Sequence, residues 1–214
     1  MNSEQWANPG FAHFFDMTIE PVILEGMFVR LEPMALGHVD ALWETGSDES
    51  LWRLIPTSVR SRDDMLRYVE TALDDQKRGV ALPFVTVERS EGNVVGSTRF
   101  GNIDVNNRRA EIGWTWVSPA WQRTAVNTEA KLLMLTHAFE VWKCVRVELK
   151  TDVLNEKSRN AILRLGAKQE GIFRKHVLCD TGRFRDSIYF SILDTEWESV
   201  KANLTSKLSA RYEK

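Results

Sequence analysis

The sequence has few cysteines, no long apolar run and no excess of charge of either sign. Cys144 and Cys179 are its two cysteines, and their spacing fits neither a Cys-x-x-Cys metal or redox motif nor a disulfide framework. We interpret them as reduced, packed thiols in a cytoplasmic protein. Charged residues break every apolar run well before the roughly 18 residues that a membrane span needs. We therefore expect no transmembrane helix and no membrane partner.

The near balance of charge excludes a globally basic nucleic-acid binder. The chain has 28 Lys and Arg residues against 30 Asp and Glu residues, a formal net charge of −2. That balance averages two opposed regions. Residues 1–70 hold five basic and twelve acidic residues, whereas residues 155–185 hold eight basic and three acidic. The basic region would suit an anionic nucleotide donor, and the acidic region would suit a cationic amine.

The length of 214 residues, 43% of them apolar, favours one domain with short extensions. Residues 1–20 show no clean period. We interpret them as an arm packed on the body or on a second subunit, as in a homodimer, with a loosely ordered tail as the alternative. Residues 21–195 form the expected domain, and residues 196–214 form a C-terminal helix packed on it or extending from it.

Hydrophobic periodicity predicts a mixed α/β fold with one central mixed sheet and helices on both faces. The three strands between residues 81 and 117 form an antiparallel meander, and the strand at 145–151 lies parallel to the third of them because a helix connects the two. Expected strands are 22–33 with an internal turn, 81–89, 94–104, 109–117, 145–151, 167–178 and 184–193. Expected helices are 35–46, 61–79, 127–142, 155–165 and 195–212.

A strand–turn–helix segment over residues 109–131 carries the first chemical signal. The first N–H groups of a helix starting near Asn127 have no partner within the helix. Together with the helix dipole they form an anion site suited to a pyrophosphate, although every helix start shares this property. Asn155 follows the next strand at a helix N-cap, so Asn155 and Ser158 should lie close to the same edge of the sheet. The alternative is that they only cap their own helix.

The motifs WxWVSPxWQ, NTEAKLLML and NEKSxNAxxxLGAxxEGxxRK, in this order, resemble the GNAT superfamily of N-acetyltransferases. More narrowly, they resemble the Rim-type branch that acetylates protein N-termini, including those of ribosomal proteins. The resemblance covers roughly residues 22–195. It implies the acyl-CoA N-acyltransferase fold, acetyl-CoA as donor, a primary amine as acceptor and direct transfer without a metal. The acceptor is a protein N-terminus or a small-molecule amine.

The resemblance also implies which residues hold the donor. The end of the strand 109–117 would pair its backbone with the pantetheine arm, and the following loop and helix start would hold the pyrophosphate. The expected donor-binding residues are Trp116, Val117, Gln122, Arg123, Thr124, Ala125, Val126, Asn127, Thr128, Asn155, Lys157 and Ser158. Ala125 and Asn127 replace glycines of the superfamily loop. Because glycine permits close approach and positive φ, we expect Ala125 to weaken donor binding without abolishing it.

Glu111 and Ser158 are the expected catalytic residues. Glu111 would take the proton of the amine, directly or through a water, and Ser158 would donate a hydrogen bond to the leaving thiolate. Alternatively, Glu111 forms a cross-strand ion pair with Arg99 or Arg109. Strand alternation places residues 111, 113 and 115 on one face and 112, 114 and 116 on the other. Weaker candidates for the base are Asp104, His176 and Tyr189. The competing function is a non-catalytic acyl-CoA-binding domain of the same fold.

Overall fold

The computed structural model describes residues 17–212. Most of the expected N-terminal arm, residues 1–16, lies outside the described residues. The last part of that arm packs on the body: Met17 is buried in the main core, and the indole N–H of Trp142 donates to the carbonyl of Thr18 at 3.1 Å. Within the described part of the chain, no helix is both long and apolar enough to cross a membrane.

A single eight-stranded sheet forms the centre of the molecule, in the order β1-β2-β3-β4-β5-β6-β8-β7. The neighbours β5 and β6 are parallel, and the other neighbouring pairs are antiparallel. The mixed sheet and the parallel pair confirm the prediction. The strands are β1 Leu24–Glu25, β2 Val29–Pro33, β3 Leu82–Glu88, β4 Val94–Asp104, β5 Arg109–Val117, β6 Arg146–Asp152, β7 Lys168–Leu178 and β8 Phe184–Leu193.

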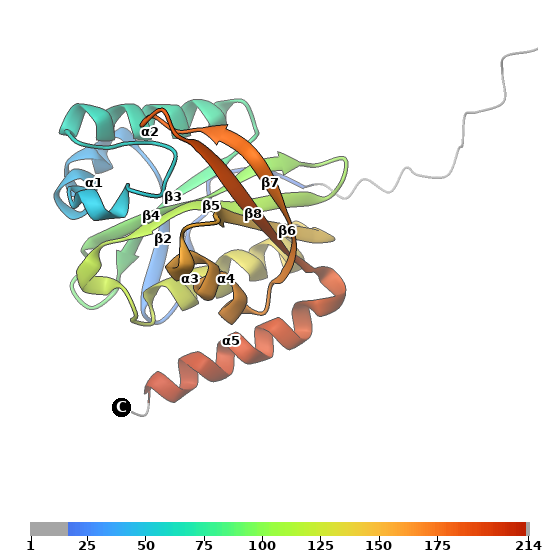
Figure 1. Ribbon diagram of the computed structural model, residues 1–214. Helices are drawn as coiled ribbons and strands as arrows, with labels where there is room; N and C mark the ends of the chain where they lie inside the picture. The colour runs from blue at the N-terminus through green and yellow to red at the C-terminus, as the bar shows by residue number, and fades with distance from the viewer. Residues whose placement is uncertain (1–16, 213–214) are drawn as a thin grey trace, which may run out of the picture.

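Helices cover both faces of the sheet (Figure 1). Two lie on one face over a smaller core, and three lie on the opposite face over the main core. The first pair is α1 Val39–Gly46 and α2 Arg62–Lys77, and the second set is α3 Val126–Thr136, α4 Glu156–Leu165 and α5 Trp197–Tyr212. Short turns of helix are Leu36–His38, Glu49–Leu51, Pro119–Trp121, the π-helical His137–Val141 and Asp194–Glu196.

Local signals explain where α2 and α4 begin and end. Ser61 accepts from the backbone N–H of Asp64 and caps α2, and Asn155 caps α4 in the same way. Gly166 ends α4 in the left-handed conformation with φ 108°. The helix expected over 127–142 differs, because it is α-helical only from Val126 to Thr136 and continues as a π-helical turn.

Candidate active site

The strands β5 and β6 diverge after a short paired stretch. They are paired only from Arg109 to Glu111 on β5 and from Arg146 to Glu148 on β6. Beyond Glu111, β5 keeps β4 as its neighbour on one side and, among residues 17–212, pairs with no strand on the other. An open strand edge offers N–H and C=O groups to an extended ligand. Because the two strands are parallel, α3 and α4 both begin near this opening.

The start of α3 supplies free backbone donors beside the opening. Among residues 17–212, no hydrogen-bond acceptor faces the N–H groups of Asn127 and Thr128, and the buried side-chain oxygen of Asn127 has no partner. Such an N-terminus suits an anionic group. The helix starts at Val126, one residue earlier than expected. That this helix start holds a pyrophosphate stays a prediction.

The loop before α3 is built without glycine. Its left-handed residue is Arg123, with φ 64°, whereas Ala125 is right-handed with φ −69°. The backbone of Ala125 therefore does not require glycine. Any effect of this residue on a bound phosphate must come from its methyl group, which is buried. Gln122 donates from Nε2 to the carbonyl of Val117 at 3.0 Å, and Thr124 donates from Oγ1 to the carbonyl of Trp121 at 2.7 Å. These bonds tie the loop to the end of β5.

The start of α4 lies on the other side of the opening. The Oδ1 atom of Asn155 accepts from the backbone N–H of Ser158 at 3.0 Å, so Asn155 does cap its own helix, as the alternative reading expected. The hydroxyl of Ser158 has no hydrogen-bond partner in the described part of the chain, and Lys157 is exposed. The Ser158 hydroxyl is therefore available to a ligand in the opening.

A β-bulge on β5 changes which side chains share a face. Opposite the single residue Thr98, β5 places both Trp114 and Thr115, and Trp114 is left-handed with φ 49°. The ring of Trp114 lies against Gly101, the residue paired with Glu111. The predicted alternation is therefore wrong beyond residue 113: Trp114 joins the face of Glu111, and Thr115 turns to α3, where it meets Lys131 at 2.7 Å.

Glu111 is buried on the face opposite α3 and is held by two partners. Its Oε2 atom lies 2.8 Å from Nζ of Lys150 on β6 and accepts from Nδ2 of Asn102 at 2.8 Å. The expected ion pair with Arg99 or Arg109 is therefore wrong, because the cation beside Glu111 is Lys150. The nearest carboxylate to Arg99 is that of Asp75, at 3.6 Å. Arg109 instead pairs with the carboxylates of Asp104 and Glu148.

Comparison with known proteins shows the family of the chain. The acetyltransferase (GNAT) domain profile matches residues 29–168, about two thirds of the chain.

The chain belongs to the GNAT acetyltransferase family, and it is an N-acetyltransferase. "Putative ribosomal N-acetyltransferase YdaF" of Bacillus subtilis is 34% identical over 63% of this chain and 73% of its own length. "[Ribosomal protein uS5]-alanine N-acetyltransferase" of Escherichia coli is 23% identical over 72% of this chain and 75% of its own.

Solved structures share the fold. A GCN5-related N-acetyltransferase from Brucella melitensis has a TM-score of 0.81 and 31% identity, covering 87% of this chain and 85% of its own. Mycobacterium smegmatis RimJ in complex with CoA-disulfide has a TM-score of 0.72 and 22% identity, covering 87% and 92%. The second likeness shows the fold alone, and the first agrees with the family assignment.

In this GNAT chain β7 and β8 form a long ribbon that passes in front of the sheet, and its turn reaches toward α2 (Figure 1). The turn of the ribbon is fixed to the loop between α1 and α2, because Asp180 donates its N–H to the carbonyl of Pro56 at 2.9 Å and accepts from the N–H of Ser58 at 2.9 Å. Aromatic rings line the ribbon, with the Phe173 and Tyr189 centroids 4.7 Å apart. The ribbon is thus held against α1 and α2, the helices on the face of the sheet that carries Glu111.

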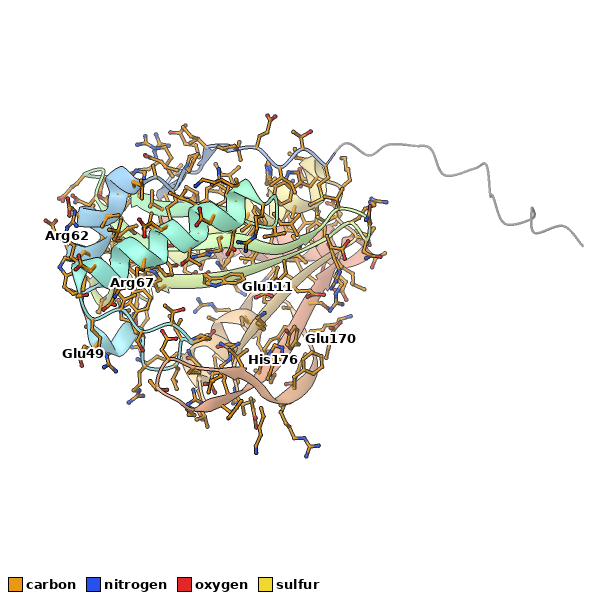
Figure 2. The ribbon with its side chains drawn as sticks, turned by 90° about the horizontal axis from the view of Figure 1, so that it is seen from above. Glu49, Arg62, Arg67, Glu111, Glu170 and His176 are labelled. Carbon is orange, nitrogen blue, oxygen red and sulfur yellow. The ribbon has the colours of Figure 1, made fainter. Side chains whose placement is uncertain are left out.

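Two of the weaker candidate bases, His176 and Tyr189, lie near Lys150 on this face of the sheet. Figure 2 shows Glu111 and His176 on the same side of the sheet. Partial burial, together with the nearby Lys150, lowers the pKa of His176 below its usual value. The Nζ atom of Lys150 lies 5.6 Å from the centre of the Tyr189 ring and 5.8 Å from that of Trp114. Asp104 is instead a turn residue that accepts from both nitrogens of Asn107.

Sequence reasoning missed Lys131, which lies on α3 beneath the bulge. Its Nζ atom donates to the hydroxyls of Thr115 at 2.7 Å and Thr98 at 3.0 Å, and its side chain meets no carboxylate at ion-pair distance among residues 17–212. Burial lowers its pKa to about 7. No signal in the sequence distinguishes this lysine from the exposed lysines of other helices.

Proposed function

We propose that this N-acetyltransferase moves an acetyl group from acetyl-CoA directly to a primary amine, with the donor held in the opening between β5 and β6. The divergence of these two strands beside the free N–H groups of α3 is the observation that carries the proposal. Relatives named as ribosomal N-acetyltransferases favour a protein N-terminus as acceptor over a small-molecule amine.

The donor-binding residues fall into three groups around the opening. The backbone of Trp116 and Val117 offers an open strand edge to the pantetheine amides, since the Trp116 side chain is buried against α1 and α2. The residues from Gln122 to Thr128 would surround the pyrophosphate, with the free N–H groups of Asn127 and Thr128 as its donors. The start of α4, with Asn155, Lys157 and Ser158, closes the other side. Acetyl-CoA supplies the activated thioester carbonyl.

Glu111 would act as the proton acceptor for the incoming amine. The amine nitrogen bonds to the thioester carbon, the carbon–sulfur bond breaks, and the proton of the amine passes to Glu111 directly or through a water. In the structure, the Nζ atom of Lys150 lies 2.8 Å from Oε2 of Glu111. An acceptor ammonium between the rings of Trp114 and Tyr189 would take the place of Nζ. The hydroxyl of Ser158 would donate a hydrogen bond to the departing thiolate.

A thiol-release assay over a panel of peptides and amines tests this function. We expect turnover with at least one acceptor, and donor binding without any turnover would favour the competing acyl-CoA-binding domain. Glu111→Gln should lower kcat by about 100-fold or more at neutral pH. Glu148→Gln is the matched control, because Glu148 lies opposite Glu111 in register but is held by Arg109 and Arg146. An unchanged kcat in Glu111→Gln would remove Glu111 as the base.

Calorimetry with Ala125→Gly tests the loop. Because Ala125 is right-handed, glycine relieves no backbone strain, and the substitution changes only the methyl group and the freedom of the chain. We expect tighter binding of acetyl-CoA from the closer approach of its phosphates. An affinity that does not rise would show that the methyl group faces away from the donor.

A further inference from the structure

Arg185 on β8 is a buried cation for which the proposed reaction has no use. Its residue is 5% exposed, and its Nε atom donates to the hydroxyl of Ser187 at 2.9 Å. Within residues 17–212 no carboxylate lies at ion-pair distance from its guanidinium. Burying an unpaired charge is costly, so an arginine kept in this state indicates a partner that binds to it.

Arg185 lies on the same face as Glu111. On β8 the side chains of Arg185, Ser187 and Tyr189 alternate with residues of the main core such as Ile188 and Phe190. The register of β6 and β8 places Tyr189 opposite Lys150 and Ser187 opposite Asp152. Arg185 therefore lies on the face of the sheet that carries Glu111 and not on the α3 face.

The nearby carboxylates of Glu111 and Asp152 are already paired. Glu111 is held by Lys150, and Asp152 forms an ion pair with Arg183. Burial lowers the pKa of Arg185, and the charges of Asp152 and Glu111 only partly oppose that effect. Among residues 17–212, the guanidinium of Arg185 therefore keeps an uncompensated positive charge beside the proposed acceptor site.

We propose that Arg185 binds a carboxylate of the acceptor, so that the preferred substrate is a primary amine with a carboxylate a few bonds away. That carboxylate is either the side chain of an acidic second residue in a peptide or the α-carboxylate of a free amino acid. The planar guanidinium can receive it through two parallel hydrogen bonds. Arg185 does not bind the phosphates of the donor, because the N–H groups proposed to hold them belong to α3 on the opposite side of the sheet. This inference rests on the proposed function.

The thiol-release assay with matched acceptors tests the inference on the full chain. At saturating acetyl-CoA, a tetrapeptide amide that begins Ser-Asp is compared with the same peptide that begins Ser-Asn, and free alanine with alaninamide. We expect kcat/KM to favour the acidic member of one pair by at least tenfold, and the pair that responds identifies the source of the carboxylate. Equal values in both pairs would overturn the inference and leave acetyl transfer itself intact. If no amine in the panel is acetylated, the proposed function is overturned as well.

Variants locate the effect. Arg185→Gln should abolish the preference by raising KM for the acidic acceptor, and Arg185→Lys should keep only part of it. Arg174→Gln is the control, because Arg174 is exposed on the adjacent β7 and its loss removes the same charge. Tryptophan fluorescence should show unchanged affinity for acetyl-CoA in all three. A preference that survives Arg185→Gln, or a loss of donor affinity in that variant, would contradict the assignment.

Discussion

Lys131→Met should stabilise the protein at pH 6 and lose that advantage as the pH rises. Lys131 is 4% exposed and is held only by the hydroxyls of Thr98 and Thr115. Those hydroxyls also bond to each other at 2.7 Å. Methionine keeps the length and the apolar stem of the side chain and removes the amine.

The sign and size follow from the pKa of Lys131. Burial lowers it from 10.5 to about 7, so between these values the unfolded chain binds more protons than the folded protein. Stability then rises with pH by up to about 1.4 kcal/mol per pH unit. Below pH 7 the buried amine is charged in the folded protein, and the fall in its pKa then lowers the free energy of unfolding by about 5 kcal/mol. Losing two neutral hydrogen bonds offsets about 2 kcal/mol of that, which leaves a gain of roughly 3 kcal/mol for Lys131→Met at pH 6.

Urea denaturation of both proteins at pH 6, 7, 8 and 9 measures this gap. We expect it to narrow by about 2 kcal/mol between pH 7 and pH 9. Lys157→Met, at an exposed position on α4, controls for loss of one positive charge and should show a small, nearly constant difference. A gap for Lys131→Met that stays constant across this range would refute the reasoning, since it would mean that the amine keeps its charge in the folded protein.

Three further substitutions test the framework of the site. Gly101→Ala should lower kcat/KM with little change in donor affinity, because a Cβ atom there would lie 2.3 Å from the Trp114 ring; normal kinetics would show that the ring does not shape the acceptor side. Glu129→Gln should cost about 2 kcal/mol in urea denaturation, because its carboxylate accepts three backbone N–H groups of residues 27–29 at 2.6–2.9 Å; an unchanged midpoint would contradict this. Asn155→Ala should cost about 1 kcal/mol through its cap, and a larger loss of acetyl-CoA affinity in the same variant would add a donor contact to that role.

Much of the fold could be predicted because its signals are local. Ser61 and Asn155 cap helices through bonds that reach three residues along the chain, and Gly166 ends a helix because it tolerates positive φ. The parallel pairing of β5 and β6 follows from the helix that connects them. The position of the opening follows in turn, since parallel strands place both helix starts at one edge.

The face of the site could not be predicted because one bulge decides it. Trp114 and Thr115 share one partner on β4, and nothing in the sequence marks the extra residue. Without the bulge Trp114 would lie on the α3 face and Thr115 on the face of Glu111. The bulge therefore places the centre of the Trp114 ring 5.8 Å from Nζ of Lys150. It also brings the hydroxyl of Thr115 to Lys131.

Regional charge was a poor guide to the electrostatics of the site, because individual pairs decide them. In the acidic first part of the chain, Asp40 pairs with Arg62 and Asp64 pairs with Arg67, so those carboxylates are not free to attract an amine. In the basic region around β8, Arg183 is neutralised by Asp152 from outside that region. The charge left without a partner under the ribbon is Arg185, and it lies on the acceptor side. The excess of basic residues therefore bears on the choice of acceptor as well as on the binding of an anionic donor.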